Sequence, residues 1–393
     1  MKARDIDPII GYPVSQMRLF KTDAEGRAIA IPFQIDETNR YGDYIFNTHL
    51  PHDQSNGIFD HKDELSLMSE DLGMRVAPTS WEHGQPYLVY QVITNHPPPL
   101  NTFYVGLFAG GKQPYAKKRY VTYDRKNAVI DTSVYRMVLN SRNYLAIEDV
   151  VLKLQPNRKI SLIDWSNFYL KLDFKYFLTF EEDHRSIDSK LRAFKSGAIR
   201  TILRVNFILN LMKLKINPGF FTEISFFANS LHLPAVIYSP FDHQKILRRG
   251  SKMYYGFALT ENPNALNIKT NMPRYDDSMR LTQAPRLNYW LGMYAPAYTV
   301  LMDINSNYRL YRNKFSPFLH VQEVPSHLLQ RNDRKNPAKQ VNTAVFFDLT
   351  RLAKGEQKFS FQSYFFNQAS STKSTNLSDY QLIPISITIA KGF

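Results

Sequence analysis

Residues 199–211 alternate between apolar and polar side chains over an unusually long run. Val205 and Leu209 fall on one side of an extended chain, whereas Arg204 and Asn210 fall on the other. Because successive side chains of a strand point to opposite faces, this pattern predicts a β-strand with one buried and one wetted face. A strand of this length is typical of a large antiparallel sheet.

Shorter runs elsewhere have the same character. Residues 28–36 alternate apolar and polar side chains, with Pro32 marking an edge or a bulge of the expected strand. The other predicted strands cover residues 87–93, 101–108, 220–227 and 253–259. In the first part of the chain turn signals recur about every ten residues, which is typical of a β-sandwich.

Composition and length set the fold class. The chain has 393 residues, with 27 Phe and 24 Tyr against 16 Gly, and aromatic residues favour pleated, half-buried sheet surfaces. A single core rarely grows beyond about 250 to 300 residues, so we expect two domains. The sequence therefore predicts an all-β protein with two antiparallel β-sandwich domains, over residues 1–147 and 148–393, of which the second is a large supersandwich.

The charge is unevenly distributed along the chain. The formal net charge is +14, yet residues 1–73 carry about six more acids than bases, so the remainder carries an excess of about twenty positive charges. Such a field attracts nucleic acid, an acidic polysaccharide or an anionic membrane surface. Nucleic acid is the least favoured of these, because the sequence has no zinc finger, ribonucleoprotein motif or glycine-rich phosphate loop.

Several kinds of site and segment are excluded or not expected. The chain has no cysteine, which excludes disulfides, thiolate metal sites and a cysteine nucleophile. No apolar run of signal-peptide length follows the first five residues, so the chain is either cytosolic or already trimmed. No transmembrane helix is expected, because the most apolar segment, residues 199–216, is interrupted by Arg200, Arg204, Lys213 and Lys215.

Residues 52–64 form an acidic loop whose spacing is similar to that of a calcium-binding loop. With Gly57 at the sixth position, where such loops need a sharp turn, oxygen-bearing side chains fall at positions five, nine and twelve. The candidate calcium ligands are Asn56, Asp60 and Asp63. His52 and Gln54 would occupy positions one and three, where a calcium ion prefers carboxylates. A metal-free Asn-Gly turn with solvated acids is the alternative.

Three phrases near the N-terminus resemble a group of uncharacterised bacterial envelope proteins. They are residues 31–37 (IPFQIDE), 56–60 with 63–68 (NGIFD and DELSLM), and 71–73 (DLG). A later phrase, residues 194–205, resembles one found in large β-sandwiches of polysaccharide-active proteins. The resemblance implies an envelope protein, periplasmic or extracellular with a signal peptide removed, although a cytoplasmic location stays open. It implies no activity by itself.

Aromatic residues gather in residues 289–294 of the C-terminal half, and aromatic and basic residues interleave in residues 308–315. Aromatic faces stack on sugar rings and bases, and an adjacent arginine holds an anion, so the pattern suits an acidic glycan or a nucleic-acid single strand. The candidate ligand-binding residues are Trp290, Arg309, Tyr311 and Arg312, together with Arg248. Ordinary core packing is the alternative explanation.

Two other groups of residues are weaker candidates for chemistry. His243 precedes Arg248, Arg249, Tyr254 and Tyr255, which include the cation and the base that a uronate lyase needs. An exposed loop is the favoured explanation. Residues 181–185 (EEDHR) combine acids with one histidine, but they lack the second spaced imidazole of a specific metal motif.

The leading hypothesis is a non-catalytic envelope protein that binds an anionic partner, either an acidic polysaccharide or another envelope protein. One alternative is a lyase-like enzyme acting on uronate glycans. Another is a structural or accessory subunit of a larger assembly, in which surface aromatics anchor the interface. Calcium is the one cofactor that the sequence suggests.

Overall fold

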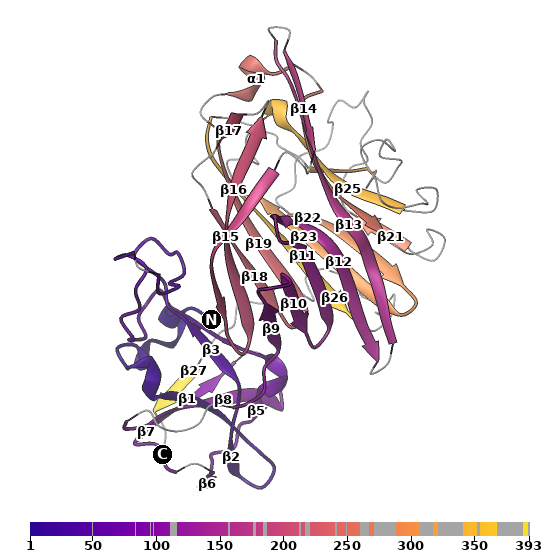
Figure 1. Cartoon of the computed structure of the whole chain (residues 1–393). Helices are drawn as coiled ribbons and strands as arrows, with labels where there is room; N and C mark the ends of the chain where they lie inside the picture. Colours follow the sequence, from indigo (N-terminus) through magenta and orange to yellow (C-terminus); the bar gives the residue numbers. More distant parts are fainter. Residues whose placement is uncertain are drawn as a thin grey trace. The chain divides into compact units, whose positions relative to one another are not determined.

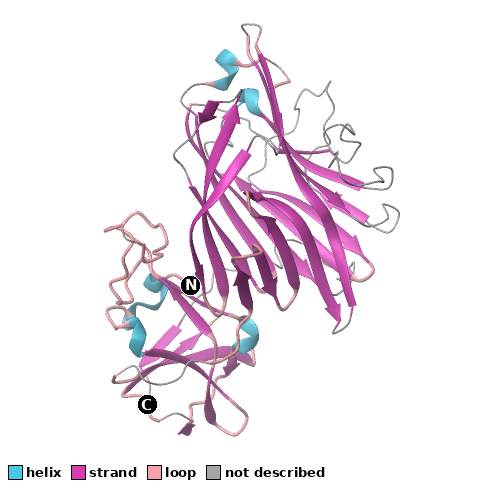
Figure 2. Ribbon diagram, in the orientation of Figure 1, coloured by secondary structure: helices cyan, strands magenta, loops and turns pink. Residues whose placement is uncertain are grey.

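The computed structural model shows an all-β protein, as predicted (Figures 1 and 2). It describes all residues except 49, 83, 95, 97, 111–115, 156–157, 176–177, 184–186, 212–213, 217–220, 240–241, 249, 260–266, 271–287, 307–316, 321–340, 352–353, 368–387 and 392–393. The chain forms two compact units. The first contains Met1–Thr122, Lys195–Thr201 and Asn376–Phe393, and the second contains Tyr123–Phe194 and Ile202–Thr375.

The first unit contains a seven-stranded sheet with the order β27-β7-β8-β1-β2-β6, in which β5 also pairs with β8. Its pairings are antiparallel except for the parallel pair β2 and β6. The strands are β1 Met17–Thr22, β2 Arg27–Ala30, β5 Gly73–Met74, β6 Ser80–Trp81, β7 Leu88–Ile93, β8 Leu100–Leu107 and β27 Thr388–Lys391. The predicted strands at residues 87–93 and 101–108 therefore correspond to β7 and β8.

A separate two-stranded ladder pairs β3 Phe33–Asp36 with β4 Glu64–Leu67. The single strand predicted over residues 28–36 is wrong, because β2 ends at Ala30 and β3 pairs with a different partner. Pro32 has no backbone N–H to continue a ladder, which explains the break between the two strands. Apolar side chains of β3 and β4 pack in the core of this unit with those of the 3-10 helix Ala3–Ile9. Two further 3-10 helices span Val14–Gln16 and Ser69–Asp71.

The second unit contains two nine-stranded sheets. One has the order β24-β25-β20-β13-β12-β11-β10-β9, with β14 paired to β13, and the other has the order β15-β16-β18-β19-β26-β23-β22-β21, with β17 paired to β16. The first of these comprises β9 Val121–Asp124, β10 Val129–Thr132, β11 Tyr135–Asn140, β12 Asn143–Gln155, β13 Arg158–Asp173, β14 Thr179–Asp183, β20 Lys252–Leu259, β24 Pro317–His320 and β25 Val341–Asp348. The second comprises β15 Ile187–Ser196, β16 Arg200–Leu211, β17 Leu214–Ile216, β18 Phe221–Phe227, β19 Ser230–Ser239, β21 Asn267–Thr270, β22 Asn288–Ala295, β23 Tyr298–Ser306 and β26 Gly355–Phe366.

These two sheets pack face to face as a β-sandwich. The ring of Tyr135 on β11 lies 4.6 Å from the ring of Phe365 on β26, measured between centroids. On β16, Val205 is fully buried and Arg204 is partly exposed, as the alternation predicted. The short helices α1 His243–Ile246 and η7 Leu349–Arg351 lie between strands of this unit along the chain. In the described part of the chain, no helix is long and apolar enough to cross a membrane.

The sequence placed a domain boundary at residue 147. In the structure this position lies inside β12, which pairs with β11 and β13 of the second unit. Ile147 itself pairs with Leu139, so the ladder runs through the expected boundary. The turn between β15 and β16 belongs to the first unit, although it comes well after Thr122, where the main part of that unit ends.

Candidate functional site

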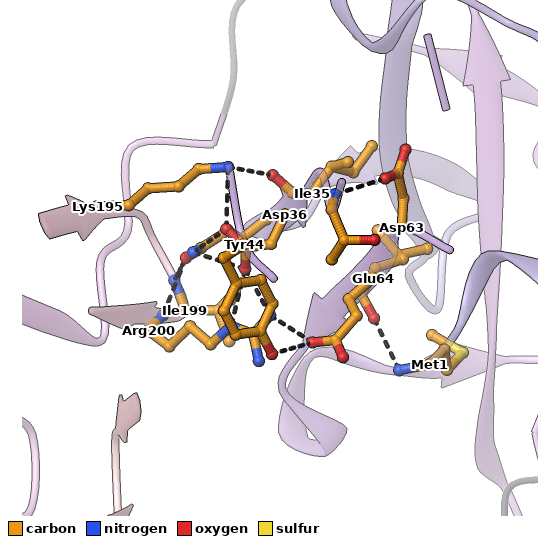
Figure 3. A network of polar contacts seen from close by, with 12 residues as sticks. Met1, Ile35, Asp36, Tyr44, Asp63, Glu64, Lys195, Ile199 and Arg200 are labelled. Atoms are coloured by element: carbon orange, nitrogen blue, oxygen red, sulfur yellow. Dashed lines mark hydrogen bonds and ion pairs between the residues drawn. The ribbon is translucent and has the colours of Figure 1, made fainter. Parts of the chain in front are cut away.

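Phrases that carry the two sequence resemblances supply one buried cluster of charged side chains in the first unit (Figure 3). Asp36 comes from β3, Glu64 from β4 and Arg200 from the first position of β16. Arg200 Nε donates to Asp36 Oδ2 at 2.7 Å, and Arg200 Nη2 donates to Glu64 Oε2 at 2.6 Å. The side chains of Arg200 and Asp36 are 5% and 0% exposed. We call Asp36, Glu64 and Arg200 the buried ion triad.

Neighbouring polar groups complete the hydrogen bonding of Asp36. Gln34 Nε2 donates to both carboxylate oxygens of Asp36, at 2.9 and 3.0 Å, and Lys195 Nζ lies 3.1 Å from Asp36 Oδ1. Gln34 Oε1 in turn accepts from the backbone N–H groups of Ile199 and Arg200, at 3.3 and 3.0 Å. Gln34 therefore links β3 to the residue 195–201 turn through its amide oxygen, while its amide nitrogen holds Asp36 on the same strand.

Glu64 has its own set of partners. Tyr44 Oη donates to Glu64 Oε2 at 2.7 Å, Lys2 Nζ forms an ion pair with Glu64 Oε1, and the guanidinium of Arg200 lies 4.9 Å from the centre of the Tyr44 ring. Burial alone would raise the pKa of Glu64, but Arg200, Lys2 and Tyr44 outweigh it and lower the pKa to about 2. Glu64 is therefore ionised throughout the physiological range.

The low pKa of Glu64 makes the fold sensitive to acid. The pKa falls from an ordinary 4.5 to about 2 on folding, so the ionised carboxylate contributes stability above pH 4.5 that is lost as the pH falls toward 2. The variant Glu64→Gln lacks this contribution. We expect the difference in free energy of unfolding between the natural protein and Glu64→Gln to shrink across that window, as measured by urea unfolding at a series of pH values. A difference that stays constant from pH 5 to about pH 2 would contradict the assignment.

The geometry of the buried ion triad is typical of a structural contact between segments of the chain. Its donors and acceptors are directed at one another, and a buried charge whose partners are all provided by the protein holds segments in register. Asp36 and Glu64 thereby fix the residue 195–201 turn against β3 and β4. Such an arrangement holds segments of the same chain together.

The acidic loop uses its side-chain oxygens to accept backbone N–H groups. Asn56 Oδ1 accepts from Ile58 at 2.8 Å, Asp60 Oδ1 accepts from Lys62 at 3.2 Å, and Asp63 accepts from Thr38 and Asp60, each at 2.9 Å. Within the described residues, no group of three or more acidic or histidine side chains could hold a metal ion. These contacts do not gather the six or more oxygens that calcium needs. The calcium site stays a prediction.

Asp63 is the most unusual acid of this loop. Its side chain is fully buried. Burial raises the pKa of Asp63 to about 6, with the charges of Asp60 and Glu37 acting in the same direction and its two backbone hydrogen bonds acting against it. The folded state therefore disfavours the negative charge that calcium would require at this position.

The predicted ligand-binding residues do not come together in the described structure. Arg309, Tyr311 and Arg312 lie outside the described residues. Trp290 lies on β22 of one sheet, whereas Arg248 follows α1, where its Nη2 donates to the carbonyl oxygen of Lys175 at 2.8 Å. These five residues stay predictions as a ligand site.

Two of the weaker candidates, His243 and Glu181, make contacts within the protein. His243 Nδ1 lies 3.0 Å from the carbonyl oxygen of Leu349, and burial lowers the pKa of His243. Tyr254 and Tyr255 lie on β20, and Arg249 is outside the described residues. Glu181 lies on β14 and pairs with Lys171 at 2.6 Å, while His184 and Arg185 also lie outside the described residues.

The second unit has an exposed group of cations that the sequence analysis missed. Lys190 and Arg192 are exposed on β15, and Phe194 on the same strand is 36% exposed. Tyr123 contacts the Phe194 ring edge-on at 5.2 Å between centroids, and the guanidinium of Arg125 lies 5.7 Å from the ring centre. We call Arg125, Lys190, Arg192 and Phe194 the basic strip. Its signal in the sequence is the alternating Lys-x-Arg-x-Phe of residues 190–194.

No ion pair of Arg125, Lys190 or Arg192 occurs in the described structure. By contrast, Arg204 on the neighbouring strand β16 is paired with Glu223 at 2.6 Å. Exposed cations two residues apart on a strand stand about 6.6 Å apart and point the same way. The basic strip therefore presents cations that form no ion pair in the described structure beside an exposed aromatic ring.

Comparisons with known proteins identify no family. No family model matches the chain, and no curated protein matches it. Among solved structures, the chain is similar to a glycosyl hydrolase of family GH92 with a TM-score of 0.27 and 8% sequence identity, over 59% of this chain and 29% of that chain. The match thus spans less than a third of that enzyme. A TM-score this low does not establish a shared fold.

Proposed function

We propose that this protein is a non-catalytic component of the bacterial cell envelope that binds an acidic polysaccharide through the basic strip. The observation that carries the proposal is the row of exposed cations on β15 that have no acidic partner in the described structure. Unpaired surface cations attract anions, and the second unit as a whole has more basic than acidic residues, which extends this attraction.

The chemistry of the basic strip favours a linear polymer with evenly spaced charges. Lys190 and Arg192 repeat along the strand at about 6.6 Å, so a chain laid along β15 meets successive cations. Phe194 adds an apolar face of the kind that stacks on flat rings, and Arg125 beside it supplies a further cation. Polymers of uronic acids combine both features, because each sugar ring carries a carboxylate.

A periplasmic or extracellular location follows from the resemblance of residues 31–37 and 63–68 to envelope proteins, and it belongs to the same proposal. A protein partner with an acidic surface is the other outcome that the same cations allow.

The proposal is tested by reversing the charge of the basic strip. We expect the natural protein to bind polygalacturonate or alginate, and we expect Lys190→Glu with Arg192→Glu to weaken binding at least about tenfold, because both cations face the polymer. Raising the salt concentration from about 0.05 M to about 1 M should have a comparable effect. Binding is measured by calorimetry and by affinity electrophoresis.

A matched control is the variant Arg158→Glu with Lys159→Glu. It makes the same change in net charge at two exposed residues at the start of β13, and we expect it to bind almost as the natural protein does. Equal losses in both variants would show that only the overall charge matters. Failure of the natural protein to bind any uronate polymer at low salt would reject the proposal.

A further inference from the structure

The turn at Asn56 and Gly57 in the acidic loop holds a chemically labile side chain in a defined position. Both residues are exposed, and Gly57 has a φ of +71°, a conformation that glycine adopts without strain. Asn56 Oδ1 accepts from the backbone N–H of Ile58 at 2.8 Å, which folds the side-chain amide back along the chain. A bond from the amide carbon, Cγ, to the backbone nitrogen of Gly57 would close a five-membered ring, and the space around position 57 is open.

A carboxylate accepts the hydrogen atom that this ring closure would release. Glu37 Oε1 accepts from the backbone N–H of Gly57 at 3.0 Å. Ser55 Oγ shares the same hydrogen at 3.1 Å and itself donates to Glu37 Oε2. Glu37 directly follows β3, so the sheet ladder positions it. The distance lies within the range over which a general base takes a proton.

A second backbone group is placed at the amide oxygen of Asn56. When a nucleophile adds to an amide carbon, negative charge develops on the amide oxygen, and an N–H aimed at that oxygen stabilises the charge. The N–H of Ile58 already donates to Asn56 Oδ1 at 2.8 Å. The turn therefore combines a nucleophilic nitrogen, a base and a donor for the developing charge around one exposed amide.

We propose that Asn56 is a modification site, at which the backbone nitrogen of Gly57 converts Asn56 to a succinimide with Glu37 as the base. The nitrogen forms a bond to Cγ of Asn56 and transfers its proton to the Glu37 carboxylate. The bond from Cγ to Nδ2 then breaks, and Glu37 returns the proton to Nδ2, which leaves as ammonia. Water opens the ring: addition at Cγ gives aspartate, and addition at the backbone carbonyl carbon gives isoaspartate.

The two products have different consequences for the loop. Aspartate keeps the backbone and adds a negative charge near Glu37. Isoaspartate carries the main chain through Cβ and Cγ, and so inserts an extra backbone atom just before a paired segment. In that segment Val14 N–H donates to the carbonyl oxygen of Gly57 at 2.9 Å, and the N–H of the fully buried Phe59 donates to the carbonyl oxygen of Tyr12 at 3.0 Å. We therefore expect the isoaspartate form to be the less stable of the two.

Asn140 provides an internal control, because it makes the same kind of turn without the reactive arrangement. Its Oδ1 accepts from the backbone N–H of Arg142 at 2.8 Å, as Asn56 Oδ1 does from Ile58. The next residue, however, is Ser141, whose side chain hinders ring closure. The nitrogen that would leave, Asn140 Nδ2, donates to Glu148 Oε1 at 2.8 Å. Asn140 should therefore remain unmodified while Asn56 reacts.

The test follows the natural protein during weeks of incubation at neutral pH. Peptide mass spectrometry detects the exchange of the amide for a carboxyl group at each asparagine, and methylation by an isoaspartate methyltransferase detects isoaspartate. We expect Asn56 to react faster in the folded protein than in guanidinium-unfolded protein. Glu37→Gln keeps an oxygen that can accept from Gly57 but is not a base, so it should slow the folded-state reaction at least about tenfold. Ser55→Ala, which leaves the carboxylate in place, should not.

The unfolded proteins separate catalysis by Glu37 from sequence-dependent lability. In guanidinium the natural protein and Glu37→Gln should react at the same rate, because the base is no longer beside Gly57. Circular dichroism and the thermal midpoint establish that the variants are folded, and the comparison of folded with unfolded natural protein needs no variant at all. The inference is overturned if folding slows the reaction of Asn56, or if Glu37→Gln reacts as fast as the natural protein or faster, because Glu37 would then only hold the loop.

Discussion

Replacing Arg200 by methionine is expected to lower the free energy of unfolding of the first unit by about 3 to 5 kcal/mol, the usual loss when one partner of a buried ion pair is removed. Asp36 is fully buried, and Arg200 donates to it and to Glu64. Without the guanidinium, two carboxylates would face each other inside the protein with less positive charge to compensate them. Lys195 and Lys2 remain, but both are more exposed to water.

Urea unfolding, followed by a probe of the first unit such as the fluorescence of Trp81, measures this effect. Arg158→Met is the matched control, since Arg158 is exposed and should change stability by no more than about 0.5 kcal/mol. A second comparison uses Glu64→Gln in both backgrounds. Neutralising Glu64 should cost less when Arg200 is already gone, because the remaining acids then repel each other less. An Arg200→Met variant as stable as the control would show that the buried ion triad adds nothing to the fold.

Strands were predictable where the pattern of side chains is local. The alternation in residues 199–211 predicts β16 because each side chain's environment depends on its parity along one strand. The same reasoning joined β2 to β3, since the rhythm of side chains continues through Pro32 while the backbone pairing does not. Periodicity describes which face a residue takes, but it does not show which strand lies next to it.

The buried ion triad could not be predicted from spacing. Arg200 and Asp36 are separated by 164 positions along the chain, and Arg200 and Glu64 by 136. The residues next to each of them in the sequence do not show that its charged side chain is buried. The phrases of the two resemblances contain all three residues, but neither resemblance predicts that the three side chains meet.

The acidic loop shows what spacing alone leaves open. Counting from Gly57 placed Asn56, Asp60 and Asp63 at ligand positions of a calcium loop, but a count does not show what each oxygen accepts. In the structure these oxygens accept backbone N–H groups within the loop and its neighbouring strands. Asx turns and calcium loops use the same residue types for this reason.

Replacing Gly197 by alanine is expected to lower the free energy of unfolding by about 2 to 4 kcal/mol, from overpacking and lost hydrogen bonds together. A Cβ at position 197 would lie 1.9 Å from Gln34 Oε1 and 2.1 Å from Gln34 Cδ. Gln34 would have to leave its place, and with it would go its bonds to Asp36 and to the backbone of Ile199 and Arg200. The measurement is again urea unfolding of the first unit.

Backbone strain does not explain the effect, and a second glycine shows why. Gly197 does not have a positive φ, whereas Gly42 has a φ of +88° and open space around it. Gly42→Ala should therefore cost only about 1 kcal/mol, from conformation alone. If Gly197→Ala costs no more than Gly42→Ala, contact with Gln34 is not the reason for the glycine.

A double-variant cycle isolates that contact. In a Gln34→Ala background the side chain that blocks position 197 is gone, so adding Gly197→Ala should be nearly neutral, or stabilising by up to about 1 kcal/mol because alanine restricts the unfolded chain. The two substitutions should then cost together little more than Gln34→Ala alone. If the free-energy costs of Gln34→Ala and Gly197→Ala simply added, the glycine would not be required by contact with Gln34. The predicted non-additivity instead follows from Gln34 filling the space that only a glycine leaves, which is how the residue 195–201 turn reaches the buried ion triad.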